Sequence, residues 1–231
     1  MVAGQPADIK AVLFDKDGTM SQSEPHLLFL ATRRLAHCVR LGGSSRADEL
    51  EEILRRAYGL HPQGESLDPA GITAVAARDH NLMATAVALT LVGHGWPESV
   101  ALAEETFRLA DLETPPDPTA SRTTEGLLDL LKDLRRQGVL CAVISNDGHG
   151  GITDFLGDHG LSEDIAAIWS ADQQPRKPDP RAVHQLCQFL GLSPSNCALI
   201  GDANSDLRMG RSAGVALTIG YRGGWRQAVT L

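Results

Sequence analysis

The sequence predicts an α/β protein with a doubly wound parallel sheet that is interrupted by an all-helical insertion. Two patterns predict this fold class. Short apolar runs alternate with helical patterns in residues 1–21 and 119–231, whereas residues 24–112 show helical periodicity without a convincing strand. With 231 residues and 42% hydrophobic content, the chain can bury a sizeable core without disulfides or a structural metal.

Five short runs predict the strands of the sheet. Each is continuously apolar and rich in valine and isoleucine, which is typical of strands buried on both faces. They are residues 11–14, 139–144, 165–170, 197–200 and 215–219. Helical spacing of apolar residues predicts helices at 124–137, 180–190 and 205–213, each followed by a glycine suited to ending a helix. This alternation predicts a parallel sheet with helices on both faces.

One interval interrupts the alternation directly after the first strand. Four helices are predicted at residues 24–41, 46–58, 69–91 and 97–112, separated by short segments that contain glycine or proline. The interval ends in the proline-rich residues 114–119, which predict a stiff linker. We therefore expect an α/β core formed by residues 1–21 and 119–231, and a helical domain at residues 22–118.

The composition argues against several classes of partner. A net charge of −8, a pI near 5.4 and 4% aromatic residues are not typical of nucleic-acid binding. The longest apolar stretch, residues 82–92, is far shorter than the roughly 20 residues that span a bilayer, and no secretory signal is recognised. Four scattered cysteines without a CxxC pair are typical of reduced packing residues. We expect a cytoplasmic protein without membrane or nucleic-acid partners; the oligomeric state is left open.

Polar side chains follow four of the predicted strands. In open parallel sheets, ligands bind at the carboxyl ends of the strands, so these side chains form the candidate site. They comprise four aspartates, a serine, an asparagine and a lysine, in chain order Asp15, Asp17, Ser145, Asn146, Lys177, Asp202 and Asp206.

The four aspartates predict a metal site with phosphate chemistry. Crowded carboxylates raise one another's pKa unless a cation relieves them, and Mg²⁺ prefers such oxygen ligands. With the metal bound, an anionic phosphate ester can approach an aspartate. Asp15 could then attack phosphorus to form an aspartyl-phosphate, while Asp17 would protonate the leaving oxygen and later activate water. Ser145, Asn146 and Lys177 would hold the phosphoryl oxygens.

These residues lie in four ordered motifs: DKDGT at 15–19, Ser145 after a buried strand, Lys177-Pro178 before a helix, and GDANSD at 201–206. In this combination the sequence resembles the haloacid dehalogenase-like hydrolase superfamily. The helical insertion is similar to the cap domain of its phosphoglycolate phosphatase and β-phosphoglucomutase branch. The resemblance covers essentially the whole chain and implies a Rossmann-like core.

The resemblance implies a role for each of these residues. Asp15 would be the nucleophile and a Mg²⁺ ligand. Asp17 would be the general acid and base and would also lend a main-chain carbonyl to the metal. Asp202 would ligate Mg²⁺, with Asp206 either a ligand or a support behind it. The serine and lysine of the second and third motifs would bind phosphate.

We therefore expect a Mg²⁺-dependent phosphatase for a small phosphorylated metabolite, such as a phosphoglycolate-like or sugar-phosphate-like ester. A phosphomutase of the β-phosphoglucomutase type uses the same groups and stays an alternative. A non-catalytic protein that binds phosphate and Mg²⁺ is a lesser alternative. A dehalogenase is disfavoured, because that branch lacks the second aspartate of the first motif. The sequence does not name the substrate.

Three smaller features complete the expectations. Residues 148–151 lack the lysine of a nucleotide phosphate loop and predict a flexible turn. Arg78, His80 and Asn81 interrupt an alanine-rich helical pattern and are candidates for substrate recognition, although an ordinary solvated helix face explains them as well. Lys16 should project away from Asp15 and Asp17 if strand alternation continues beyond the first strand.

Overall fold

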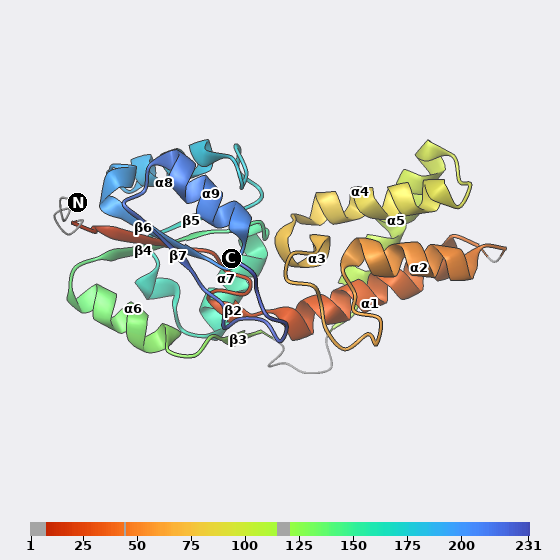
Figure 1. Cartoon of the computed structure of the whole chain (residues 1–231), viewed down its shortest axis with the longest axis horizontal. Helices are drawn as coiled ribbons and strands as arrows, with labels where there is room; N and C mark the ends of the chain where they lie inside the picture. Colours follow the sequence, from red (N-terminus) through yellow and green to blue (C-terminus); the bar gives the residue numbers. More distant parts are fainter. Residues whose placement is uncertain (1–7, 44, 115–120) are drawn as a thin grey trace. The chain divides into compact units, whose positions relative to one another are not determined.

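The computed structural model describes residues 8–43, 45–114 and 121–231 (Figure 1). Contacts within the chain divide it into two compact units, Met1–Gln22 with Arg122–Leu231, and Ser23–Ser121. The expected linker at 114–119 lies, apart from Thr114, outside the described residues, as does the expected boundary at 118/119. In the described part of the chain, no helix combines the length and apolarity needed to cross a membrane.

The first unit is built on a five-stranded parallel sheet, as predicted. Its strands are β1 (Ala11–Phe14), β4 (Leu140–Ile144), β5 (Ala167–Trp169), β6 (Cys197–Gly201) and β7 (Leu217–Gly220), in the spatial order β5-β4-β1-β6-β7. Strand β1 pairs with β4 on one side and with β6 on the other. The strand order therefore reverses at β1, and such a switch point is where open α/β sheets bind ligands.

Both faces of the central strand β1 are buried, which explains its continuous apolar run. Ala11 and Leu13 belong to one core cluster, with side chains from α8 (Pro180–Phe189) and α9 (Asn204–Ala213). Val12 and Phe14 belong to the other, with side chains from α6 (Leu127–Arg136) and α7 (His149–Asp158). Figure 1 shows α8 and α9 on one face of the sheet and α6 on the other. The predicted fold class is confirmed.

Two details of this unit differ from the expectations. The expected flexible turn at residues 148–151 is wrong, because helix α7 begins at His149 and contains Gly150 and Gly151. Gly151 lets the main chain of α7 lie close to the Asp147 side chain, since a Cβ at this position would lie 2.5 Å from an Asp147 carboxylate oxygen. In addition, a short antiparallel ribbon joins β2 (Ser21–Gln22) to β3 (Arg122–Thr123). Two-residue strands are too short to show a sequence period.

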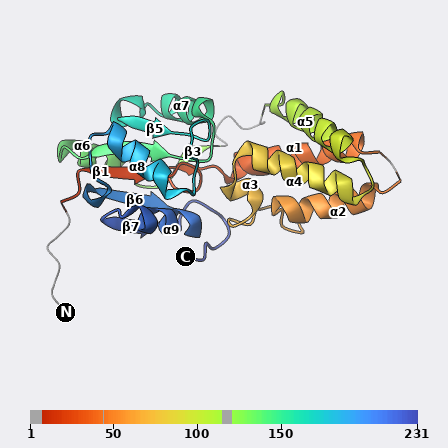
Figure 2. The same ribbon diagram turned by 90° about the horizontal axis from the view of Figure 1, so that it is seen from above.

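The second unit is helical. It comprises α1 (Glu24–Leu41), α2 (Ala47–Tyr58), α3 (Ile72–Val75), α4 (Arg78–Leu91) and α5 (Trp96–Asp111). Helix α5 packs against α1 and α4, and α2 packs against the same two helices (Figure 2).

The single helix expected at residues 69–91 is wrong, because the chain is extended at Ala76 and Ala77, between α3 and α4. The side-chain amide of Asn81 donates hydrogen bonds to the carbonyls of Ile72, Ala76 and Ala77 at 3.1–3.2 Å. The Ile72 and Ala77 carbonyls also accept main-chain N–H groups at 3.0–3.2 Å, so the Asn81 amide adds a bridge between the two sides of the break. Asn81 is buried and its amide nitrogen holds this break together, so substrate recognition is not needed to explain it.

Candidate active site

A lysine and two aspartates meet at the carboxyl ends of the strands. Asp15 directly follows β1, Lys177 lies in the loop between β5 and α8, and Asp206 lies in the first turn of α9. The Lys177 ammonium lies 2.7 Å from Asp15 Oδ1 and 2.9 Å from Asp206 Oδ1, and it also donates to the Ile144 carbonyl at 3.3 Å. All three charged side chains are buried.

Asp202 completes a cluster of three buried carboxylates. One oxygen from each of Asp15, Asp202 and Asp206 lies within 4.8 Å of the other two. Burial raises the pKa of Asp15; the Lys177 charge lowers it, and the Asp206 and Asp202 charges raise it further. The net result is a pKa well above the usual range, with burial as the largest cause. The donor set, three hard oxygen ligands, fits Mg²⁺.

Lys177 stays charged in this environment. Burial acts to lower its pKa, but Asp15 and Asp206 outweigh burial and hold the pKa above the ordinary lysine value. The positive charge of Lys177 therefore lies beside the predicted nucleophile, Asp15. At this position it could also stabilise negative charge on the oxygens of a phosphoryl group during transfer.

Asp17 lies apart from the three-carboxylate cluster. Its carboxylate forms an ion pair with Lys16 at 2.9 Å, and the same ammonium lies 2.7 Å from Asp147 Oδ2. The resemblance implies that Asp17 ligates the metal through its main-chain carbonyl oxygen. The ion pair with Lys16 involves only the side-chain carboxylate, so it leaves that oxygen unaffected.

The expectation that Lys16 points away from Asp17 is wrong. The main chain turns immediately after the strand, since the Lys16 carbonyl accepts hydrogen bonds from the N–H groups of Met20 and Ser21 at 2.8 and 2.9 Å. Strand alternation therefore ends before Lys16. Its side chain is buried, and its pKa is raised because Asp17 and Asp147 outweigh the lowering effect of burial.

The two predicted phosphate-binding residues of the second motif follow β4, the strand beside β1. Ser145 is buried, and its N–H donates to the Trp169 carbonyl at 2.9 Å, which extends the pairing of β4 with β5. Its hydroxyl oxygen accepts from the Asp147 N–H at 3.2 Å. Asn146 is half-buried and comes next in the chain. Both positions follow the carboxyl end of β4, where the sequence placed them, and β4 pairs with β1.

Two further residues contact the cluster and escaped the sequence reasoning. Trp225 Nε1 donates to Asp202 Oδ2 at 2.5 Å, and Thr19 Oγ1 donates to Asp202 Oδ1 at 3.3 Å. Thr19 belongs to the DKDGT motif and could have been included on that ground. Trp225 lies in an irregular segment after the last strand, 23 residues beyond Asp202, and no local pattern connects the two.

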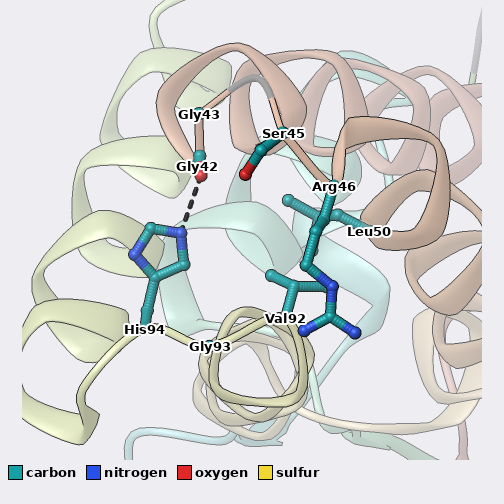
Figure 3. A pocket seen from close by; sticks show the side chains of 8 residues that line it. All are labelled: Gly42, Gly43, Ser45, Arg46, Leu50, Val92, Gly93 and His94. Atoms are coloured by element: carbon teal, nitrogen blue, oxygen red, sulfur yellow. Dashed lines mark hydrogen bonds between the residues drawn. The ribbon is translucent and has the colours of Figure 1, made fainter.

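A hollow of about 200 Å³ in the helical unit does not contain any of the predicted site residues (Figure 3). It lies between the α1–α2 and α4–α5 connections. Its two large polar side chains already have partners. His94 Nε2 lies 2.7 Å from the Gly42 carbonyl oxygen, while Arg46 contacts Glu49 at 2.6 Å and donates to the Leu91 carbonyl at 3.2 Å. These bonds tie two loops together.

Two of the proposed recognition residues in the helical unit differ in their surroundings. Arg78 Nε donates to Asp111 Oδ2 at 3.0 Å, and its guanidinium lies 5.1 Å from the Phe107 ring centre. This contact joins the start of α4 to the end of α5. His80 is exposed at the first turn of α4. A role for either residue in substrate recognition stays a prediction.

Comparison with known proteins places the chain in a family. Residues 9–214 match the family model described as haloacid dehalogenase-like hydrolase. Because the match covers most of the chain, the protein belongs to this family, as predicted.

The most similar proteins include phosphatases. The chain is 28% identical to phosphoglycolate phosphatase 1 of Pseudomonas aeruginosa, over 93% of this chain and 71% of that protein. It is 27% identical to N-acetylmuramic acid 6-phosphate phosphatase of Pseudomonas putida, over 92% of this chain and 84% of that protein. The crystal structure of a predicted phosphoglycolate phosphatase from Haemophilus somnus superimposes with a TM-score of 0.69 at 20% identity, over 97% of this chain and 91% of that one.

The predicted reaction class is thereby confirmed: the chain is a phosphoric monoester hydrolase of the haloacid dehalogenase-like family. The structural likeness, at 20% identity, supports the fold alone.

Proposed function

We propose that this protein is a Mg²⁺-dependent phosphatase that hydrolyses a small phosphorylated metabolite through an aspartyl-phosphate on Asp15. The observation that carries the proposal is the buried cluster of Asp15, Asp202 and Asp206, contacted by Lys177 at the carboxyl ends of β1 and β6. Mg²⁺ held by the three carboxylates would neutralise charge on the phosphate oxygens.

The residues divide the reaction into two displacements. In the first, an Asp15 carboxylate oxygen bonds to phosphorus, the ester P–O bond breaks, and Asp17 gives its proton to the leaving oxygen. In the second, Asp17 takes a proton from water, the water oxygen attacks phosphorus, and the bond to Asp15 breaks to release phosphate. Lys177, Ser145 and the Asn146 amide hold the phosphoryl oxygens, and Lys177 also orients Asp15.

The helical unit is proposed as the cap that selects the substrate. This assignment rests on the family, in which an insertion after the first motif has this role, and on the compact helical unit that residues 23–121 form. A cap that closes excludes water and bulky substrates, which favours a small phosphate ester. The relatives named for phosphoglycolate and N-acetylmuramic acid 6-phosphate support an organic-acid or sugar phosphate.

The nucleophile is tested by replacing Asp15 with asparagine. The variant should lose turnover of p-nitrophenyl phosphate, and EDTA should abolish wild-type turnover until Mg²⁺ is restored. Asp129→Asn, at an exposed position of α6, is the matched control and should keep full activity. Full activity of Asp15→Asn would refute the assignment.

The substrate class is tested with a panel of phosphorylated metabolites. Release of inorganic phosphate from small acid or sugar phosphates is expected. Incubation with a hexose 1-phosphate separates the alternative, because an isomerised sugar phosphate in place of free phosphate would identify a phosphomutase.

A further inference from the structure

The chain segment after the last strand brings an indole to the carboxylate cluster. Trp225 lies in the irregular residues 221–231, and only 8% of its surface is exposed. Its Nε1 donates a hydrogen bond to Asp202 Oδ2 at 2.5 Å. None of the expected motifs includes this residue, so its contact with a metal-binding carboxylate needs an explanation of its own.

Tight packing holds the indole in place. Gly18 follows the aspartate pair with φ +75°, and a Cβ at this position would collide with both Trp225 Nε1 and Asp202 Oδ2. A Cβ at Gly224 would collide with the Gly18 carbonyl. The turn after the nucleophile strand and the C-terminal segment therefore pack main chain against main chain. This packing leaves the indole little freedom to leave Asp202.

The hydrogen bond restricts the Asp202 carboxylate. Trp225 binds one carboxylate oxygen, and the Thr19 hydroxyl binds the other at the longer distance of 3.3 Å. Each oxygen keeps a second lone pair, so the carboxylate can ligate a cation while its rotation is limited. Loss of a group that orients a metal ligand in this way typically weakens metal binding about 10- to 100-fold.

We propose that Trp225 is a positioning residue that holds Asp202 for a divalent cation and thereby sets the metal affinity of the site. The proposal rests on the proposed function, because it requires that the three carboxylates bind a metal. It adds the C-terminal segment to the parts of the chain that build the site. A variant that lacks the indole N–H should bind metal more weakly, while the chemistry at saturating metal should change less.

Tryptophan fluorescence offers a readout that does not depend on turnover. Trp225 contacts a metal-binding carboxylate, whereas Trp96 lies in the helical unit and Trp169 donates its N–H to the Pro175 carbonyl. Adding Mg²⁺ to the chelated protein should therefore change the emission of Trp225. The change should persist in Trp96→Phe and be lost in Trp225→Phe.

The decisive measurement is calorimetric titration of Mg²⁺ into the chelated full-length protein. Trp225→Phe should weaken binding about 10- to 100-fold, and Trp96→Phe should bind as the wild type does. Because phenylalanine also leaves space, a second variant carries 3-benzothienylalanine at position 225, which keeps the indole shape but has sulfur in place of the N–H. Circular dichroism checks that each variant is folded.

Weakened binding in both position-225 variants supports the proposal. Wild-type affinity in the benzothienyl variant would overturn it, because shape rather than the hydrogen bond would then set the affinity. Wild-type affinity in both variants would overturn it as well, while leaving the metal-dependent phosphatase intact. A wild-type protein that shows no heat of Mg²⁺ binding and no dependence on Mg²⁺ would overturn both proposals.

Discussion

Replacing Lys177 with methionine should destabilise the metal-free protein strongly. The substitution keeps the apolar stem but removes the ammonium that contacts Asp15 at 2.7 Å and Asp206 at 2.9 Å. Hydrogen bonds to charged groups contribute about 1.5–3 kcal/mol each, so the two contacts correspond to about 3–6 kcal/mol. Asp15 already has a raised pKa and can take up a proton when the lysine is lost. Protonation of Asp15 would reduce the repulsion among the carboxylates. The expected loss of unfolding free energy is therefore at the lower end of this range, about 3 kcal/mol at neutral pH.

The assay is denaturant unfolding in EDTA and again in excess Mg²⁺, followed by circular dichroism. Mg²⁺ should restore part of the stability of the variant, because the cation replaces the missing positive charge. The matched control is Lys132→Met on the exposed face of α6, which should change the unfolding free energy by less than about 0.5 kcal/mol. A loss below about 1 kcal/mol for Lys177→Met in EDTA would refute the view that this lysine offsets part of the negative charge of the cluster.

Two further predictions concern pH and the helical unit. Because the folded-state pKa of Asp15 lies above its ordinary value of 3.8, the metal-free protein should lose stability as the pH rises from that value through the raised pKa. In EDTA, the melting temperature of the wild type relative to that of Asp15→Asn should fall as the pH rises. The stabilisation of the wild type by Mg²⁺ should grow over the same pH range. A difference in melting temperature between the two proteins that does not change with pH would contradict this cause. Asn81→Ala should lower the unfolding free energy by about 2 kcal/mol, because it removes the buried amide whose hydrogen bonds bridge the break between α3 and α4. Its exposed neighbour His80→Ala should have no measurable effect in the same denaturant series, and equal effects of the two would argue against the structural role of Asn81.

The sequence by itself determined the sheet and the positions of the motifs along it. Strands buried on both faces require continuous apolar runs. Polar residues that directly follow such runs therefore lie at the carboxyl ends of the strands. Asp15 and Asp202 could therefore be placed at the ends of two strands before the pairing of those strands was known. The same local reasoning placed Ser145 after a third strand. These predictions depend on a few neighbouring residues, and the structure has each strand close to the predicted bounds.

Tertiary structure alone decided which charged and polar groups meet. The contact between Lys177 and Asp15 joins residues 162 positions apart, and that between Trp225 and Asp202 joins an irregular segment to a strand end. Lys16 pairs with Asp17 because the chain turns sharply after β1, where a strand period no longer predicts side-chain direction. Hydrophobic burial follows the local period of the sequence, whereas an ion pair or hydrogen bond depends on distances of a few ångström that only the completed fold determines.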